Sequence, residues 1–376
     1  MSSVGIITYH AAYNFGSVLQ AYATQKAIEK LGYEATIINY RPATQRNYYE
    51  LYRWKISTKF LVKDLTMLPV QRMRRLRRER YEAFIASKMN LTEMKYIDRR
   101  ELTALSDCFD VYVSGSDQII NKHSNELESD SWDAMDPYLL MFTEKRKVSY
   151  ASSPANMTVE EMKRIAPKLS RFDALSAREP DASKLMEELT SKKVETVLDP
   201  TLLLDSNEWA KIADGAQDSL PDNYILYYTL DGTNKLIKRR ETLRRLSGEL
   251  GLPILMLTPF GHIPPERGLL SLPQAGPCEF LNAVRNARLI VTDSYHGTLF
   301  SINFGVPFLS ISDGSASSRR KDWIVQRLNC GSNLISDIDD AVCKVSDFTI
   351  VASSKDLDQP RTDSIKYLSS SLSGER

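Results

Sequence analysis

Short apolar runs alternate with helical patterns along the chain, and this alternation predicts an α/β fold. The first apolar run, at 5–8, is followed by a polar loop, a helical pattern over 17–31 and a second apolar run at 35–39. Gly32 is suited to end that helix, because glycine readily takes the left-handed conformation found after a helix C-terminus. The opening is therefore a β-α-β unit, but it lacks GxGxxG and does not by itself indicate a nucleotide site.

The same alternation continues in two series. In the first, strands are expected near 111–113, 147–152, 174–177 and 195–198, with helices over 159–169 and 181–189, the latter capped by Asp181. A break follows at 199–222, where Pro200 and Pro221 flank a short helix. In the second series, strands are expected near 224–229, 254–257, 289–291 and 307–310, and helices over 236–250, 279–286, 299–304 and 320–328.

Two such series predict two Rossmann-like, doubly wound domains that face a cleft, the GT-B-like architecture of B-type glycosyltransferases. We expect a first domain over 1–205, a second over 206–345, and a C-terminal segment over 346–376 that is a polar tail or a helix crossing back to the first domain. Such a fold hosts many reactions, so it does not identify one.

Residues 44–100 differ from this pattern and are expected to be a mostly helical insertion in the first domain. Tyr48, Tyr49, Tyr52, Trp54 and Phe60 precede a run of arginines between Arg72 and Arg80. Two interpretations stay open. The arginines form a solvated helix face paired with nearby acids, or they form a patch for anionic groups, either substrate phosphates or an anionic membrane surface.

Composition narrows the class of protein. The chain has 376 residues, 42% of them hydrophobic and 26% charged, as in ordinary globular proteins. Its formal net charge of +1 argues against nucleic-acid binding. The N-terminus enters a strand directly and resembles no signal peptide, and four scattered cysteines form no CxxC pair, so we expect a cytoplasmic protein without a zinc site.

The stretch from Ala287 to Phe300 carries the most informative chemistry. A buried strand ends at a polar cluster, DSYHG at 293–297, and a helical pattern follows from Leu299. Ligands bind at the C-terminal ends of strands in such sheets, and helix N-termini attract anions. His296, one of only four histidines, is therefore a candidate catalytic or ligand-binding group, although it would also suit a helix cap or a bond to a backbone carbonyl.

Several motifs, in their order and spacing, resemble the polysaccharide pyruvyl transferases. They are GIITYH at 5–10, NFGSVLQAYA at 14–23, SGSDQ at 114–118, SARE at 176–179, LDPT at 198–201 and DSYHG at 293–297. The resemblance extends over about residues 4–330, and it is the combination that is specific.

This resemblance implies transfer of a pyruvyl group from phosphoenolpyruvate, a co-substrate, to a sugar. Bacterial members often form a cyclic ketal, commonly 4,6-linked on a hexose, in capsule or exopolysaccharide synthesis. The acceptor is often a lipid-linked saccharide at the cytoplasmic face of the membrane. Neither a cofactor nor a metal is expected.

The resemblance and the chemistry together suggest roles for individual residues. His296 would protonate the enol methylene or act as a base, and Asp117 would activate the sugar hydroxyl unless it is a helix N-cap. Arg178 resembles the phosphoenolpyruvate-binding arginine of the family, although a salt bridge to Glu179 or Asp181 is the alternative. Ser294, Tyr295, Gly297 and Thr298 would complete the donor site, with backbone N–H groups of the last two holding phosphate. The acceptor would meet Asn14, Gly16, Ser17 and Ser116.

One departure from the family is Ser294, because better-known branches have an arginine there. We expect Arg319 to replace the missing charge. Two other hypotheses remain open. One is a glycosyltransferase that uses a nucleotide-sugar bound near Pro259, His262 and Glu279, and the other is a non-catalytic module that binds an anionic glycan.

Overall fold

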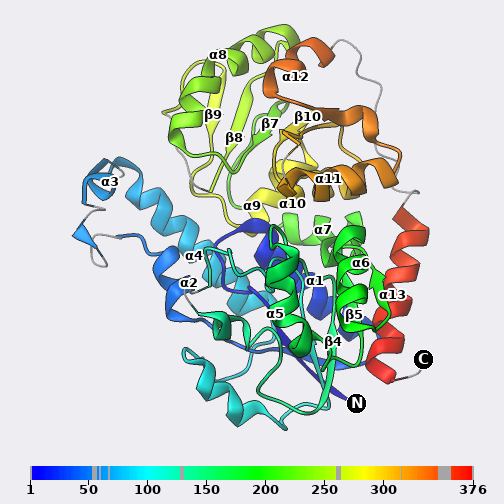
Figure 1. Cartoon of the computed structure of the whole chain (residues 1–376). Helices are drawn as coiled ribbons and strands as arrows, with labels where there is room; N and C mark the ends of the chain where they lie inside the picture. Colours follow the sequence, from blue (N-terminus) through cyan, green and yellow to red (C-terminus); the bar gives the residue numbers. More distant parts are fainter. Residues whose placement is uncertain are drawn as a thin grey trace.

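The computed structural model describes residues 2–52, 57–58, 61–66, 68–127, 131–259, 264–314, 316–345 and 357–374. Two parallel sheets, each covered by helices on both faces, form two domains, the second above the first in Figure 1. Trp54 and Phe60 of the aromatic run and His262 lie outside the described residues.

The first sheet has the strand order β2-β1-β3-β4, and two further strands, β5 and β6, continue it through the bridge between Val148 and Ala174. Its strands are β1 (Ser3–Ile7), β2 (Glu34–Ile37), β3 (Val111–Ser114), β4 (Arg146–Ser149), β5 (Leu175–Ala177) and β6 (Val194–Thr196). The helices beside it are α1 (Phe15–Lys30), α5 (Val159–Leu169) and α6 (Pro180–Thr190). Asp181 is not the cap of α6, because the helix already begins at Pro180 and its N-cap is Glu179.

The second sheet has the order β12-β11-β10-β7-β8-β9, and all its strands are parallel. The strands are β7 (Ile225–Tyr228), β8 (Ile254–Leu257), β9 (Leu269–Ser271), β10 (Leu289–Thr292), β11 (Phe308–Ile311) and β12 (Leu334–Ile335). The helices are α8 (Thr233–Leu250), α9 (Pro277–Arg285), α10 (Tyr295–Phe304), α11 (Ala316–Arg327) and α12 (Ile338–Lys344). The short strands β9 and β12 were not predicted.

An apolar core joins the two domains. Phe15 of α1 stacks on Phe280 of α9, with ring centroids 4.6 Å apart. Between the domains, the turn η6 (Pro200–Leu202) leads to α7 (Ser206–Ala213), which packs against α9. Asn303 donates side-chain hydrogen bonds to the carbonyls of Thr201 and Leu204. These contacts hold the facing ends of the two sheets together.

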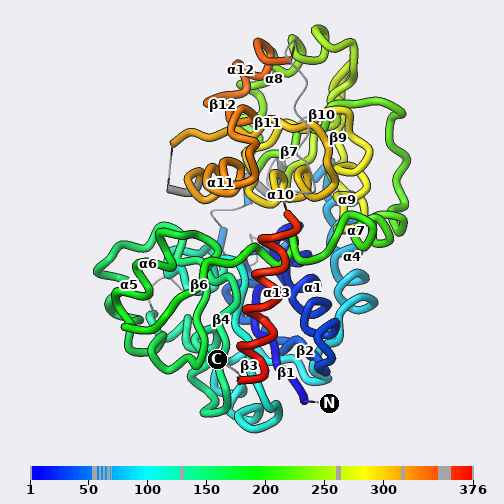
Figure 2. Tube along the Cα trace, turned by 90° about the vertical axis from the view of Figure 1, so that its right-hand side faces the viewer, coloured from blue at the N-terminus to red at the C-terminus, as the bar shows by residue number. Residues whose placement is uncertain are grey.

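The C-terminal helix α13 (Asp358–Ser373) lies beside α1 against the first domain (Figure 2). The hydroxyl of Tyr367 donates to the carbonyl of Ser149 at the end of β4, and Arg361 donates to the carbonyl of Leu202. Helix α13 therefore closes one side of the first sheet.

The insertion between β2 and β3 consists of α2 (Ala43–Tyr48), α3 (Leu61–Thr66), the turn η3 (Leu68–Val70) and α4 (Gln71–Lys88). Helix α3 projects from the body of the molecule in Figure 1. The arginine run of α4 is divided between two environments. Arg80 pairs with Asp218 and Glu279 of the second domain, and Arg77 donates to the carbonyls of Tyr13 and Thr258, whereas Arg72 and Arg75 are exposed.

Candidate active site

A cavity of about 320 Å³ lies where the facing sheet ends meet. It is lined by residues that follow β1 and β3 in the first sheet, and β7 and β10 in the second. In each sheet these two strands are neighbours, β1 beside β3 and β10 beside β7. The chain adds further strands outward from them in opposite directions. Ligands of doubly wound domains bind at this switch point, because the loops there diverge to opposite faces and leave a crevice.

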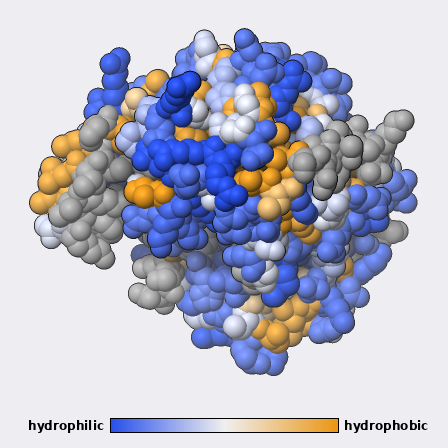
Figure 3. All heavy atoms as spheres, turned by 90° about the horizontal axis from the view of Figure 1, so that it is seen from above, coloured by the Kyte–Doolittle hydropathy of each residue, from blue (hydrophilic) through white to orange (hydrophobic). Residues whose placement is uncertain are grey.

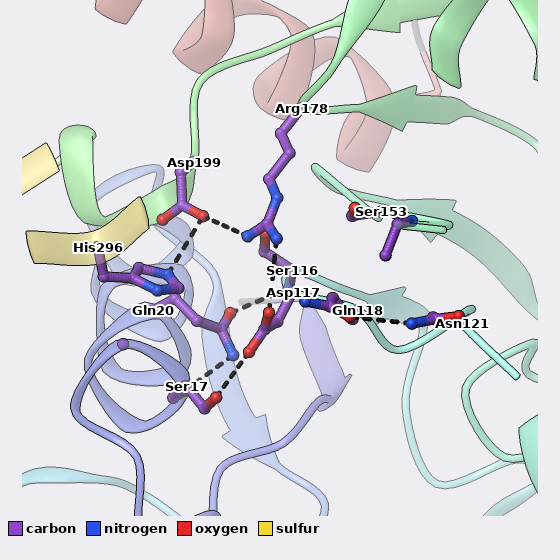
Figure 4. A network of polar contacts seen from close by, with 12 residues as sticks. Ser17, Gln20, Ser116, Asp117, Gln118, Asn121, Ser153, Arg178, Asp199 and His296 are labelled. Atoms are coloured by element: carbon purple, nitrogen blue, oxygen red, sulfur yellow. Dashed lines mark hydrogen bonds and ion pairs between the residues drawn. The ribbon is translucent and has the colours of Figure 1, made fainter. Parts of the chain in front are cut away.

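Arg178 is the centre of the polar network in this cavity (Figure 4). It follows β5, and its buried guanidinium pairs with Glu179 at 3.1 Å, Asp199 at 3.0 Å and Asp117 at 3.5 Å. It also lies over the ring of Tyr295, 4.5 Å from the centroid. Burial disfavours its charge, but Tyr295 and the three carboxylates together raise the pKa of Arg178. The salt bridge to Glu179 that was considered as an alternative is therefore formed, but it is one part of a buried network. Arg178 lines the cavity all the same.

Asp117 follows β3 with a left-handed backbone, φ 72°, and a turn rather than a helix comes after it. It is therefore not a helix N-cap. Its carboxylate accepts a 2.6 Å hydrogen bond from the hydroxyl of Ser17. Burial favours the neutral acid, but the charges of Arg178 and His296 and the hydrogen bond from Ser17 outweigh burial and lower the pKa of Asp117. This carboxylate stays ionised and is a weaker proton acceptor than an ordinary aspartate.

His296 lies in the first turn of α10, because the helix begins at Tyr295 and not at Leu299 as predicted. The cap is Ser294, whose hydroxyl accepts a hydrogen bond from the Gly297 N–H. His296 is therefore not the helix cap, and its Nε2 atom makes no hydrogen bond to a backbone carbonyl of the described residues but faces Asp199 at 3.6 Å.

The imidazole of His296 rests against the first domain at Gly16. A Cβ at Gly16 would lie 2.0 Å from Nδ1 of His296, so only glycine leaves room for the ring at the start of α1. Gly16 is thus needed to seat His296 and does not line the cavity.

Asp199 was quoted within the LDPT motif but was not predicted as a site residue. Its side chain is fully buried, and one oxygen accepts from the N–H and the hydroxyl of Thr201. The other oxygen faces Arg178 and His296, as Figure 4 shows. Burial opposes ionisation, but the charges of His296 and Arg178 and the hydrogen bonds lower the pKa of Asp199. This carboxylate holds the guanidinium and the imidazole in place together.

The structure differs from the prediction for the replacement arginine. Arg319 is exposed and does not line the cavity, whereas Arg320 does. Nε and Nη1 of Arg320 are buried and have no hydrogen-bond partner among the described residues. Burial and the charge of Arg178 lower the pKa of Arg320. The helical spacing could have identified Arg320, because it lies one turn before the buried Ile324 and therefore on the same, inward face of α11.

The other predicted residues divide into two groups. Asn14, Ser17, Ser294 and Tyr295 line the cavity. Three others lie behind it, where their backbone or hydroxyl groups are already bonded: Ser116, Gly297 and Thr298. The two backbone N–H groups expected to hold phosphate donate to Ser294 instead.

The predicted nucleotide pocket of the second domain is not assembled by the residues described there. Glu279 accepts hydrogen bonds from the N–H groups of Gly276 and Gln217 and pairs with Arg80, so it caps α9. His262 and its neighbours at 260–263 lie outside the described residues.

Comparison with known proteins gives a family and a fold. The family model for polysaccharide pyruvyl transferase matches residues 14–315. No curated protein sequence matches the chain significantly.

Solved structures with a similar fold include three UDP-GlcNAc 2-epimerases. The enzyme from Neisseria meningitidis, bound to UDP-GlcNAc, has a TM-score of 0.57 and 11% identity over 100% of both chains. The enzyme from Rickettsia bellii has a TM-score of 0.55 and 12% identity over 99% of this chain and 96% of that chain. The enzyme from Methanocaldococcus jannaschii, with UDP-GlcNAc and UDP, has a TM-score of 0.51 and 14% identity over 91% and 90%. The predicted GT-B architecture of two Rossmann-like domains is confirmed, and at these identities the likeness concerns fold alone.

Proposed function

The chain belongs to the polysaccharide pyruvyl transferase family, and from this premise we propose that it transfers the pyruvyl group of phosphoenolpyruvate to a pair of hydroxyls on a hexose. The product is a cyclic ketal, 4,6-linked, on a lipid-linked saccharide of capsule or exopolysaccharide synthesis. The enzyme works at the inner face of the membrane and needs neither metal nor cofactor.

The observation that carries this proposal is that two buried guanidinium nitrogens of Arg320, Nε and Nη1, have no hydrogen-bond partner among the described residues and lie in the same cavity as Arg178 and His296. Leaving charged N–H donors without partners costs free energy unless a ligand accepts their hydrogen bonds. Phosphoenolpyruvate carries a phosphate and a carboxylate, and both groups pair well with guanidinium forks. The hydroxyl of Ser294 lines the same cavity and can supply a neutral donor.

The reaction requires two proton transfers. Two hydroxyl oxygens bond to C2 of phosphoenolpyruvate, and the bond between C2 and the phosphate oxygen breaks. The two hydroxyls release two protons. One of them replaces the proton that the acid gives to C3, which turns the methylene into a methyl group, and the other leaves with inorganic phosphate.

His296 is the proposed acid that protonates C3. Its Nε2 atom faces the fully buried carboxylate of Asp199 at 3.6 Å, and this contact fixes the orientation of the ring in the cavity. Protonation at C3 makes C2 electrophilic, so the acid and the donor-binding arginines have to share one cavity, as they do here.

The projecting insertion suits a membrane-bound acceptor. Large apolar side chains are exposed along it, namely Leu61, Leu65, Leu68, Met73 and Leu76. Arg72 and Arg75 are exposed beside them on α4. Apolar atoms gather on this projecting edge in Figure 3. Apolar side chains flanked by arginines bind the interface of anionic bilayers. Among the described helices, none combines the length and the apolar character needed to span a bilayer.

The experiment is incubation with phosphoenolpyruvate and a panel of p-nitrophenyl hexosides, followed by phosphate assay and by mass and proton NMR spectra of the product. The expected result is acceptor-dependent phosphate release and one new methyl signal, with at least a 100-fold loss of rate in His296→Ala. Vinyl protons in the product would indicate an enolpyruvyl ether instead. Consumption of a UDP-sugar without any turnover of phosphoenolpyruvate would overturn the proposal in favour of glycosyl transfer.

A further inference from the structure

The cavity has a second wall whose chemistry differs from that of the arginine wall. It is formed by Tyr9 after β1, by Tyr48 and Tyr49 at the end of α2, and by Ser124, Asn125 and Glu126 in the loop that follows β3. Tyrosine faces and neutral hydrogen-bonding groups suit an uncharged polyhydroxylated ligand, because the rings cover C–H surface while the amide, hydroxyl and carboxyl groups bond the hydroxyls. The two walls together match an anionic donor and a neutral sugar.

Glu126 is the ionisable group at the centre of this wall. Its buried carboxyl accepts a 2.9 Å hydrogen bond from the hydroxyl of Tyr49 and another from the side-chain amide of Gln45. Burial raises the pKa of Glu126 to about 7. The negative charge of Asp117 also raises this pKa, whereas the hydrogen bonds from Gln45 and Tyr49 lower it. Near neutral pH the carboxyl can therefore both accept and release a proton.

The groups that face Glu126 do not compete with it as proton acceptors. Burial raises the pKa values of Tyr9, Tyr49 and Tyr138 well above the ordinary value, so these phenols stay neutral. The carboxylate of Asp117 is held by Ser17 and Arg178 and has a lowered pKa. The nearby His123 is engaged with Glu161 at 2.9 Å.

We propose that this wall is the acceptor subsite and that Glu126 takes the proton of the hexose hydroxyl that attacks C2 of phosphoenolpyruvate. The proposal rests on the pyruvyl transfer proposed above. A lone pair of the hydroxyl oxygen forms the bond to C2, the proton moves to Glu126, and the O–H electron pair stays on the oxygen. The proton leaves later with the departing phosphate, which restores the carboxylate.

In this proposal the insertion between β2 and β3 also contributes to catalysis, because its helix α2 contacts Glu126. Gln45 and Tyr49 come from α2 and the residue after it, and they bond both oxygens of Glu126. Tyr49 in turn contacts the ring of Tyr13 at 5.5 Å between centroids. Helix α2 therefore positions the loop that carries the base, and the insertion is part of the acceptor site as well as of the projecting surface.

The test compares Glu126→Gln and Tyr49→Phe with a matched control, Glu82→Gln. Glu82 also accepts from a tyrosine hydroxyl, that of Tyr13, and from a side-chain N–H group, that of Arg41, but it does not line the cavity. The measurements are kcat and both KM values from pH 5.5 to 9, calorimetric binding of phosphoenolpyruvate, saturation-transfer NMR of p-nitrophenyl hexosides, and thermal stability.

We expect Glu126→Gln to bind phosphoenolpyruvate as the unchanged protein does, to lose at least 100-fold in kcat, and to lose the ionisation near pH 7 on the acid side of the rate profile. Tyr49→Phe should raise the KM for the hexoside several-fold and shift that ionisation upward, since the carboxylate loses a donor. Glu82→Gln should leave all kinetic constants unchanged.

The proposal is overturned if Glu126→Gln keeps the ionisation near pH 7, or if its only effect is a loss of stability like that of Glu82→Gln. A weakened affinity for phosphoenolpyruvate with unchanged hexoside binding would also overturn it. Failure of the pyruvyl-transfer proposal is distinguishable, because the hexoside NMR signals of the unchanged protein, and their weakening in Tyr49→Phe, report on the subsite without any turnover.

Discussion

Replacing Gly16 with alanine tests how the first domain seats His296. The three heavy atoms nearest to a Cβ at Gly16 all belong to the His296 ring, with Nδ1 at 2.0 Å, whereas an ordinary contact begins near 3.4 Å. The ring and the helix have to separate by about 1.4 Å. Because α1 is buried at this point, most of the movement falls on the imidazole.

The size of the effect follows from this displacement. Overpacking of a buried site lowers the free energy of unfolding by about 1–3 kcal/mol. A displacement of about 1 Å in a catalytic group lowers the rate by about 100-fold. We therefore expect Gly16→Ala to lower kcat about 100-fold and to lower the free energy of unfolding by about 1–3 kcal/mol.

The assay is phosphate release at saturating phosphoenolpyruvate and hexoside, with urea unfolding in parallel. Since the added methyl group acts through His296, Gly16→Ala should cause no further loss of rate in a His296→Ala background. Gly248→Ala is the control, because its Cβ meets no atom within 4 Å in an exposed part of α8. It should keep full activity and gain about 0.5–1 kcal/mol. Full activity of Gly16→Ala, or a further loss in the double variant, would refute the reasoning.

Three further predictions concern other parts of the molecule. Arg320→Gln should raise the KM for phosphoenolpyruvate about tenfold or more in steady-state kinetics, because a charge-assisted hydrogen bond contributes about 1.5–3 kcal/mol, whereas Arg319→Gln should not change it. Asp199→Asn should lower the free energy of unfolding at pH 7 by about 3 kcal/mol, because Arg178 loses a buried partner. The folded-state pKa of Asp199 is lowered below the ordinary value of an aspartate, so the contribution of this carboxylate is complete above about pH 4 and is lost as the pH falls toward the folded-state pKa. Urea unfolding of the variant should therefore vary less with pH in that acid range than unfolding of the unchanged protein. Leu65→Ser should weaken binding to phosphatidylglycerol vesicles several-fold in a sedimentation assay, since a leucine inserted in the interface contributes about 1 kcal/mol or more, while Ile237→Ser, equally exposed at 55%, should bind as before.

Much of the fold could be predicted from local pattern. The strands of both sheets that are four or more residues long were placed within two or three residues, because alternation of buried strands and amphipathic helices is a local property. The start of α10 was placed four residues late, since its first turn is polar and buried against the first domain, so the pattern alone did not include it.

Individual site residues were harder to predict. Arg178, Asp117 and His296 follow strands, and parallel strands bring their C-terminal ends to one edge, so their meeting could be expected. Arg319 and Arg320 are adjacent in sequence but point about 100° apart on a helix, and only the packing of α11 decides which one enters the cavity.

The sequence by itself therefore determined the two-domain α/β architecture, the family and the loops that carry the chemistry, because these depend on residue types at short spacings. Only the tertiary structure decided the partners of those residues: Asp199 between Arg178 and His296, Gly16 beneath the imidazole, and Glu126 beneath α2. Each of these contacts joins segments far apart in the chain, and its effect on charge and proton affinity depends on burial that no local pattern contains.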